Sequence, residues 1–497
     1  MLESGKIPTR GSRQPLDVTL TNRWAVFHSP YSYEAIDPFF RYKHPSAFWA
    51  FKFQRRRWGN DKPWDGYVRF FKRSRVPSGL FLAQRERLVE QFDLSVDDQR
   101  QSVSFNPLTN SSWAFQNECL AKMLKARNHG GLILNATGSG KTRIAGLYFK
   151  ALRGSGCFVV DELTLLDQAR KALSEVIGES VGIIGAGRFS PRRITVATVQ
   201  TLHRHRHDKE FKLWMRGLQV LFIDEVHLAL NKRNLSTVQS INPPVVLGLT
   251  ATLSLQKAPI RLRAFALTGP VLYEYPYRRG VEEKHLTSGI VIAVDLDRSV
   301  GNTESGTHSE AYDRFVVRSK RRNNLIEAII REAHELGYHT IALVERIRHL
   351  KFLSRRVSDV PHRVVYGAKS RSFRRQAKKS FDASRIRLLI ANRVFKKGVD
   401  IKKVDTMIDG ASYRSREDAM QKFGRGVRLC VGKRGLIYYD VGDSGLSPFT
   451  KATKYRRGAF RKAGIPVFKY RWTGDVKDLF EFAQKKLEST LKKEAAA

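Results

Sequence analysis

One short turn, Ala136–Thr142, constrains the fold of this chain more than any other segment, and it has the sequence Ala-Thr-Gly-Ser-Gly-Lys-Thr. It follows the apolar run Leu132–Leu134 and precedes a helical pattern that starts near Arg143. Glycines at such a turn let backbone N–H groups converge on a phosphate group at the N-terminus of a helix. Asn135 stands where the usual pattern has its first glycine. The residues that we expect to hold phosphate are Thr137, Gly138, Ser139, Gly140, Lys141 and Thr142.

Acidic residues end a second apolar run. Asp224 and Glu225 open the string Asp-Glu-Val-His, directly after Val220–Ile223. A carboxylate at the end of a buried strand can orient water bound to Mg²⁺, and a second one can polarise the water that attacks a γ-phosphate. Together with the phosphate turn, this pattern predicts hydrolysis of ATP. Lys141 is expected to contact the phosphates. Thr142 and Asp224 are expected to hold Mg²⁺, and Glu225 to act on the water.

A third string, Gly248–Thr252 (Gly-Leu-Thr-Ala-Thr), follows the apolar run Val245–Leu247. Small hydroxyl residues at a strand end suit a hydrogen-bonded relay that senses the state of a nucleotide. His227, in the preceding string, is expected to contact either the γ-phosphate or this relay.

Short apolar runs alternate with helical patterns twice along the chain. Runs of this kind between helices are typical of parallel strands whose sheet is covered on both faces. We therefore expect an α/β fold with two consecutive parallel-sheet domains, and a polar linker at Ser299–His308. The runs are Gly131–Leu134, Cys157–Val160, Val181–Ile184, Ile194–Ala197, Val220–Ile223 and Val245–Leu249, then Thr340–Val344, Arg363–Tyr366, Arg387–Ile390, Thr406–Ile408 and Gly435–Tyr439.

The charge of the chain indicates a polyanionic partner. The formal net charge is +42, from 89 Lys and Arg against 47 Asp and Glu. Residues 313–400 carry 23 basic and 8 acidic side chains, inside sequence with the pattern of a folded domain. A basic face that binds a phosphate backbone is therefore favoured over a disordered arm. A structural role, as in a ribosome or a capsid, is the alternative.

Composition and cysteine use limit the class of protein further. No apolar stretch is long enough to cross a bilayer, and the N-terminus lacks the pattern of a signal peptide. Three cysteines, Cys119, Cys157 and Cys430, are widely spaced and form no Cys-x-x-Cys pair. We therefore expect no membrane contact, no disulfide framework and a cytoplasmic location, which would be the host cytoplasm for a viral protein.

Two further strings lie in the second expected domain. They are Ala391–Asp400 and Gln421–Arg428, the latter with the sequence Gln-Lys-Phe-Gly-Arg-Gly-Val-Arg. In order and spacing, the five strings resemble motifs I, II, III, V and VI of superfamily-two helicases, over roughly residues 110–440. The resemblance implies two RecA-like lobes that bind ATP and Mg²⁺ between them and nucleic acid across their tops. Arg425 and Arg428, three residues apart on an expected helix, would share one face and stabilise charge on the γ-phosphate.

The same resemblance implies further contacts, residue by residue. Those to the nucleotide are Phe115, Gln116, Gly398 and Asp400, with Gln421 in the catalytic set, and those to nucleic acid are Gln168, Thr198, Gln200 and Thr201. Asp161 and Glu162 depart from the family pattern, because acidic residues offer fewer donors to the phosphates of a strand.

The N-terminal hundred residues narrow the resemblance. The segment Trp64–Lys72, followed by Val76–Leu80, is similar to the opening domain of UvsW-type bacteriophage helicases. Turn, strand and helix signals here predict a small α+β accessory domain. The cluster Arg55, Arg56 and Arg57, flanked by Trp49, Phe51, Phe53 and Trp58, is expected to bind DNA through its arginines, while the aromatic residues either stack on bases or form the core.

The resulting expectation has four parts: an accessory domain at 1–105, lobe one at 106–285, lobe two at 286–450 and a basic C-terminal extension at 451–497. The resemblance implies a DNA helicase or translocase that regresses forks, migrates branches or unwinds DNA in recombination, repair or replication. An RNA helicase is the alternative within the class. A non-catalytic nucleic-acid scaffold is the alternative outside it, against which Lys141, Glu225 and Arg428 argue.

Overall fold

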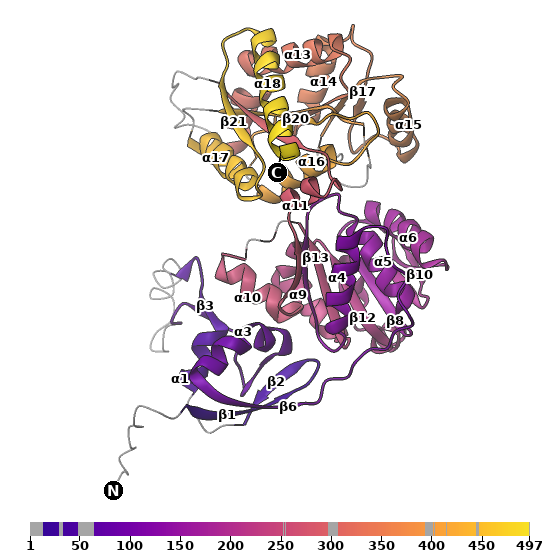
Figure 1. The fold of residues 1–497 in the computed structure, drawn as a ribbon, viewed down its shortest axis with the longest axis vertical. Coiled ribbons are helices and arrows are strands. Elements are labelled where there is room, and N and C mark those ends of the chain that lie inside the picture. The colour runs from indigo at the N-terminus through magenta and orange to yellow at the C-terminus, as the bar shows by residue number, and fades with distance from the viewer. Residues whose placement is uncertain are drawn as a thin grey trace. The chain divides into compact units, whose positions relative to one another are not determined.

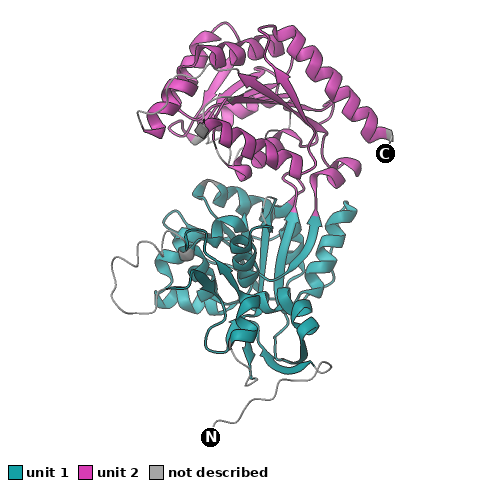
Figure 2. Cartoon of the chain, turned by 90° about the vertical axis from the view of Figure 1, so that its left-hand side faces the viewer, with its two compact units in different colours: residues 1–134, 141–274 teal, residues 135–140, 275–497 magenta. Residues whose placement is uncertain are grey.

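The computed structural model describes residues 13–28, 33–47, 64–251, 253, 255–296, 307–392, 401, 403–413, 415–443 and 447–496. The chain forms two compact units (Figure 2). Unit 1 comprises residues 1–134 and 141–274, and unit 2 comprises residues 135–140 and 275–497. Among the described helices, none combines the length and the apolar character that a bilayer crossing requires.

A small α+β region opens unit 1 (Figure 1). Its elements are β1 (Gln14–Leu20), β2 (Trp24–Phe27), α1 (Tyr33–Ile36), η1 (Asp37–Phe40), β3 (Arg41–Lys43), β4 (Tyr67–Arg69), β5 (Arg75–Pro77), α3 (Ser78–Gln91) and β6 (Phe92–Asp98). Four strands lie in the order β5-β2-β1-β6, with β1 antiparallel to β2 and parallel to β6. Leu16, Val18 and Leu20 of β1 are buried in one core with Leu80 and Leu88 of α3. The α+β architecture expected for this region is confirmed.

A parallel sheet flanked by helices follows in the same unit. Its strands are β7 (Gly130–Asn135), β8 (Ser155–Val160), β9 (Gly182–Gly185), β10 (Arg188–Ser190), β11 (Ile194–Thr198), β12 (Leu218–Asp224), β13 (Val245–Thr250) and β14 (Val271–Tyr275). Its helices are α4 (Ala114–Lys125), α5 (Lys141–Ala151), α6 (Leu163–Ile177), α7 (Val199–His205), α8 (Lys209–Arg216), η2 (Val226–Leu230), α9 (Lys232–Ile241) and α10 (Ala258–Leu267). The strand order is β10-β9-β11-β8-β12-β13-β7-β14, and neighbours from β9 to β7 pair in parallel.

Alternate side chains of β12 show how helices cover both faces of this sheet. Leu221 and Ile223 lie in one core with residues of α7, α8 and α9. Phe222, between them, contacts the rings of Tyr148 and Phe149 on α5, with centroid distances of 5.4 and 5.0 Å. Because both faces are buried, the middle of the strand, Val220–Ile223, is apolar without polar alternation.

Unit 2 contains the second sheet. Its strands are β15 (Gly289–Leu296), β16 (Thr340–Leu343), β17 (His362–Val365), β18 (Leu388–Ala391), β19 (Thr406–Asp409), β20 (Leu436–Asp443) and β21 (Val467–Arg471). Its helices are α11 (Tyr277–Glu282), α12 (His308–Tyr312), η3 (Asp313–Val317), α13 (Lys320–Glu335), α14 (Ile347–Arg356), α15 (Arg371–Asp382), α16 (Arg416–Gly426), α17 (Ser447–Lys462) and α18 (Val476–Ala496). The order is β17-β18-β16-β19-β20-β15-β21, with parallel neighbours throughout.

This second sheet is also covered on both faces. Ile290, Ile292 and Val294 of β15 share a core with residues of α13, α14 and α18, which Figure 1 shows near one another. Val291 of the same strand lies in a second core with residues of α15, α16 and α17. The two expected parallel-sheet lobes are therefore confirmed.

Two expectations about the second half require correction. The polar segment Ser299–His308, of which 299–306 lie outside the described residues, was expected to join the two sheet domains. It instead follows β15, which already belongs to the second sheet. Residues 451–497 do not form an extension, because β21 pairs with β15 and α18 contributes to the core beneath the sheet. Arg456 and Arg457, which contribute to the basic character of this segment, are buried and form ion pairs with Asp440.

Candidate active site

The phosphate turn lies where the sequence places it, between β7 and α5. Lys141 is the first residue of α5 and Thr142 the second. Gly138 and Gly140 adopt φ values of 93° and 79°, a left-handed backbone that residues with a Cβ rarely adopt. The glycines are therefore required by the shape of the turn, which brings the backbone onto the N-terminus of a helix.

Acidic and hydroxyl side chains meet at the carboxyl ends of β12 and β13, which are neighbours in the sheet. Thr250 Oγ1 donates to Glu225 Oε2 over 3.2 Å. His227 Nδ1 lies 3.3 Å from Glu225 Oε2 and 3.4 Å from Thr250 Oγ1. His227 thus contacts the third string, one of the two alternatives that the sequence left open. These contacts join two strand ends into one hydrogen-bonded group.

The pKa values of the two carboxylates are shifted in opposite directions. Burial, and then the charge of Glu225, raise the pKa of Asp224 to about 6, against the opposing effect of Lys141. Burial alone would also raise the pKa of Glu225, but the His227 hydrogen bond and the Lys141 charge outweigh it and lower that pKa. The nearby positive charge therefore does not offset the burial of Asp224, and a divalent cation would add to it.

The donor set fits Mg²⁺ bound together with a nucleotide. Among the residues that the structure describes, no group of three or more His, Cys, Asp or Glu side chains could hold a metal. Asp224 and the Thr142 hydroxyl are hard oxygen ligands of the kind that Mg²⁺ prefers, and phosphate oxygens and water would complete its octahedron. The residues present therefore fit Mg²⁺ brought in with ATP, as expected.

Two of the residues expected to contact the nucleotide are buried. Phe115 and Gln116, at the start of α4, are both fully buried. Ser111 Oγ donates to Gln116 Oε1 over 2.5 Å, which orients the amide. Trp113, partly exposed, stacks on Phe115 with a centroid distance of 5.7 Å. Trp113, which the sequence pattern did not single out, is thus the more exposed of the two stacked rings at this end of α4.

Helix α16 carries Gln421 and Arg425, but it ends at Gly426. Arg428 therefore lies beyond the helix, and the expectation that both arginines share one helical face is wrong. The segment is instead held by Thr287, whose Oγ1 donates to the Arg428 carbonyl oxygen over 3.2 Å and whose N–H donates to the Val427 carbonyl oxygen over 2.8 Å. The position of Arg428 is set by this loop and not by the period of the helix.

A buried ion pair that the sequence pattern did not reveal anchors α16. Lys422 Nζ donates to both carboxylate oxygens of Asp409, at 2.9 and 3.0 Å. The hydroxyls of Tyr413 and Tyr438 donate to the same carboxylate over 2.7 and 2.6 Å. Burial alone would raise the pKa of Asp409, but Lys422 and Arg456 lower it. The pair fixes the face that α16 turns toward the sheet.

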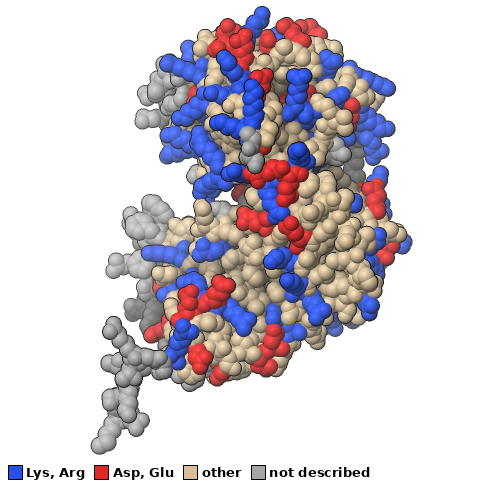
Figure 3. All heavy atoms as spheres, viewed as in Figure 1, with Lys and Arg blue, Asp and Glu red and all other residues tan. Residues whose placement is uncertain are grey.

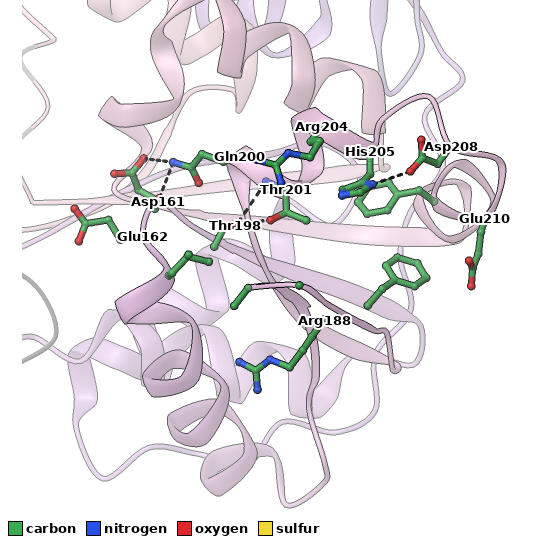
Figure 4. Close-up of a pocket in the computed structure, with 15 residues that line it drawn as sticks. Asp161, Glu162, Arg188, Thr198, Gln200, Thr201, Arg204, His205, Asp208 and Glu210 are labelled. Atoms are coloured by element: carbon green, nitrogen blue, oxygen red, sulfur yellow. Dashed lines mark hydrogen bonds and ion pairs between the residues drawn. The ribbon is translucent and has the colours of Figure 1, made fainter. Parts of the chain in front are cut away.

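Three of the expected nucleic-acid contacts lie in one pocket of unit 1. Thr198, Gln200 and Thr201 line it, together with the two acidic residues that depart from the family pattern (Figure 4). Thr198 is almost fully buried and accepts from the backbone N–H of Thr201, so it caps α7. Gln168, exposed on α6, does not line the pocket. Arg55, Arg56, Arg57, Gly398 and Asp400 lie outside the described residues.

Two parallel-sheet lobes, one with a phosphate turn and paired carboxylates, define a motor ATPase with RecA-like lobes. Residues 108–255 match the family model of the type III restriction enzyme res subunit, and residues 320–430 match that of the helicase conserved C-terminal domain. The chain belongs to the superfamily 2 helicases, and it is a nucleic-acid-dependent ATPase.

Individual relatives are distant in sequence. The DNA 3′-5′ translocase XPB2 of Sulfurisphaera tokodaii is 24% identical over 353 residues, which cover 63% of this chain and 78% of the relative. A provisionally named ATP-dependent RNA helicase of Acanthamoeba polyphaga mimivirus is 24% identical over 365 residues, covering 71% and 67%. Among solved structures, S. cerevisiae Dbp5 bound to RNA and ADP BeF3 has a TM-score of 0.52, 13% identity, and coverage of 75% and 93%. T4 UvsW has a TM-score of 0.43, 15% identity, and coverage of 92% and 99%.

Proposed function

We propose that this chain is an ATP-driven motor that remodels branched or forked DNA in recombination, repair or replication. The observation that carries the motor part is the contact of Glu225 with His227 and Thr250, at adjoining strand ends. Such a group can couple the water-activating carboxylate to a residue that responds to the nucleotide.

The roles of the residues follow from this placement. Lys141, at the start of α5, would contact the β- and γ-phosphates, and Thr142 and Asp224 would hold Mg²⁺. When bound, Mg²⁺ neutralises charge on the phosphate oxygens. Glu225 would orient and polarise the attacking water. Arg425 and Arg428 would stabilise the charge that develops on the γ-phosphate, with Gln421 beside them.

Three observations support a nucleic-acid substrate, and the first of them favours DNA. The relative from Sulfurisphaera is named a DNA translocase. In the N-terminal region, Arg23 and Arg75 lie over the ring of Trp24, at 5.3 and 4.7 Å from its centroid, which combines cations with an aromatic surface as strand binding requires.

The third observation is the basic surface of unit 2. On the face in Figure 3, Lys and Arg side chains are spread over this unit. The exposed basic residues of α17 are Lys451, Lys454, Arg461 and Lys462. Cations on a folded surface attract a phosphate backbone and make binding depend on salt.

An RNA helicase is the second candidate, because the mimivirus relative is named for RNA and Dbp5 was solved with RNA. The deciding experiment measures ATP hydrolysis and strand separation with single-stranded, duplex, forked and four-way DNA, and with matched RNA. Highest turnover on forked or four-way DNA is the expected result. Stimulation by RNA alone would assign the chain to the second candidate.

A further inference from the structure

The pocket in unit 1 that Thr198, Gln200 and Thr201 line is larger than contact with a strand backbone requires. Its volume is about 770 Å³, within the usual range for sites that enclose an organic molecule. It lies between the start of α6, the β9–β10 hairpin, α7 and the start of α8. Phosphate contacts on a motor lobe need only a shallow groove, so this pocket calls for a second kind of ligand group.

Exposed apolar side chains form part of its walls. Leu163 and Phe189 are 47% and 39% exposed, and both line the pocket. Phe189 packs against the buried ring of Phe211, with the two centroids 5.5 Å apart. The ring of His205 also contacts Phe211, with a centroid distance of 5.9 Å. An exposed ring packed against a buried one is a stable platform on which a flat ring can stack.

The polar groups of the pocket are separated into two ends. Figure 4 shows Asp161 and Glu162 together at one end and His205, Asp208 and Glu210 at the other. At the second end, Asp208 accepts from His205 over 2.7 Å. Acidic groups at the first end would repel phosphate, but they can accept hydrogen bonds from an amino group.

The Asp161 end is held in place by Gln200. The Gln200 amide donates to the Asp161 carbonyl oxygen over 2.7 Å and lies 3.3 Å from its carboxylate. Gln200 was expected to contact nucleic acid, and the structure shows it orienting an acidic residue instead. The Asp161 carboxylate therefore has a defined direction, as recognition of an amino group requires.

A cation for an adjoining phosphate is also available. Arg204 is exposed, lines the pocket and lies on α7, the helix that Thr198 caps. Arg188, also in the lining, is paired with Asp167 at 3.0 Å. Arg204 is the better candidate for a phosphate, because the ion pair with Asp167 already engages the guanidinium of Arg188.

We propose that this pocket takes one unstacked base of a bound strand. The base stacks on Phe189, its exocyclic amino group donates to Asp161 and Glu162, and Arg204 contacts a flanking phosphate. Cytosine, adenine and guanine carry an exocyclic amino group and thymine does not, so the pocket disfavours thymine. This inference rests on the proposed function, since it presumes that the motor binds a strand.

The test compares dT oligomers with the same oligomers that carry a single dC, placed at successive positions. Cytosine and thymine are similar in size and stacking, so the comparison isolates the amino group. Fluorescence anisotropy should show about fivefold tighter binding when dC stands at one particular position. Replacing both carboxylates (Asp161→Ala with Glu162→Ala) should abolish that difference and leave dT binding measurable.

The aromatic platform has its own variant and control. Phe189→Ala should weaken binding of dC and dT strands alike, by about tenfold. Phe352→Ala is the matched control, because Phe352 is 40% exposed on α14 and lies outside the pocket. It should bind like the unmodified protein.

The outcomes separate this proposal from the one on which it rests. If dC and dT strands bind alike and Phe189→Ala has no effect, while dT strands still stimulate ATP hydrolysis, the base pocket is overturned and the motor stands. If no strand binds or stimulates hydrolysis, both proposals fail. If an oligo-arginine peptide binds the unmodified protein but not the double variant, and strands show no base preference, the pocket belongs to a protein partner instead.

Discussion

At the scale of single residues, the backbone of Glu225 is the most unusual feature of the active site. Its φ and ψ of 50° and 58° are left-handed, although Glu225 is not a glycine. A conformation of this kind costs roughly 1–3 kcal/mol and persists only where the surroundings hold it. Here the strain turns the carboxylate from the end of β12 toward Thr250, on the neighbouring strand.

The first prediction concerns that carboxylate. Glu225→Gln should abolish nucleic-acid-stimulated ATP hydrolysis, because the amide cannot polarise the attacking water. Binding of ATP and of nucleic acid should persist, since the substitution keeps the size of the side chain. The measurement is phosphate release alongside nucleotide and strand affinity. Lys141→Ala is the comparison, because it should lose nucleotide affinity as well; normal turnover in either variant would refute the site.

The second prediction concerns pH. Because burial and Glu225 raise the pKa of Asp224 to about 6, Asp224 takes up a proton as the pH falls through that value. Mg²⁺ must displace this proton, so the apparent affinity for Mg²⁺ should fall about tenfold per pH unit below 6 and level off above it. Calorimetric titration of Mg²⁺ with ATP present gives the profile. Asp224→Asn is the control, since only the proton uptake of ATP itself should then remain.

The third prediction concerns Arg428. Arg428→Ala should lower kcat by about a thousandfold while ATP affinity stays within a few-fold, as expected for a group that acts on transition-state charge. Steady-state kinetics and equilibrium nucleotide binding separate the two effects. A variant that loses ATP binding but keeps its turnover per bound ATP would place this role elsewhere.

At the scale of elements, helix α16 is anchored by a buried ion pair, while it carries two of the residues expected in the catalytic set. Lys422 and Asp409 pair inside the unit, while Gln421 and Arg425 lie on the same helix and remain partly exposed. The ion pair costs desolvation, which its three further hydrogen-bond partners help to offset. We infer that the pair sets the rotation of α16 about its axis.

The fourth prediction tests this anchor. Lys422→Met leaves the Asp409 carboxylate buried without its cation, and should lower the free energy of unfolding by about 3–5 kcal/mol. Chemical denaturation measures the loss. Adding Asp409→Asn removes the uncompensated charge and should recover part of the stability. If the single variant is as stable as the unmodified protein, the pair does not anchor the helix.

Sequence patterns predict a strand well where all of its side chains are buried, and poorly where buried and exposed side chains are mixed along it. The run Cys157–Val160 is buried throughout, so its apolar sequence reveals β8. Strand β15 has the same apolar signature, and it could have been predicted from it. Strand β21, with Lys469 and Arg471 exposed at the edge of the sheet, has the composition of a surface segment.

The residues of the candidate site also differ in how well the local sequence predicts them. Lys141, Asp224 and Glu225 stand in short segments that directly follow a strand. The local sequence pattern therefore predicts their position at the ends of the strands. Asp409 and Lys422 are thirteen residues apart and meet only because a helix packs onto the sheet, so no local pattern contains their pairing. Nothing in the sequence around Arg456 distinguishes it from an exposed arginine. Its burial is explained by the ion pair with the buried Asp440.

At the scale of the whole molecule, the N-terminal region and the first sheet domain share a core. Leu262 and Ala266 of α10 lie in the same buried cluster as Phe81 and Leu88 of α3. The two helices approach closely because Gly79 has no side chain: a Cβ there would lie 2.5 Å from the carbonyl oxygen of Phe265. Expected as a separate domain, residues 1–105 belong to the same compact unit as the sheet.

The fifth prediction follows from this shared core. Removing residues 1–100 should expose the apolar face of α10, lower the melting temperature of the remainder and increase its binding of a hydrophobic dye. Differential scanning fluorimetry of the full and shortened chains measures both. Gly79→Ala should act in the same direction but more weakly, because it separates the helices without removing either. Unchanged melting in both variants would show that the two parts are independent.

The close approach at Gly79 also limits which segments of this chain can be replaced by those of a relative. A chimera that takes its first hundred residues from a relative would bring a foreign α3 against the α10 of this chain, where the fit is decided by single atoms. The smallest transferable piece is therefore discontinuous in sequence: residues 13–98 together with α10, from Ala258 to Leu267. Recombination at the apparent domain boundary alone would join two halves that do not match.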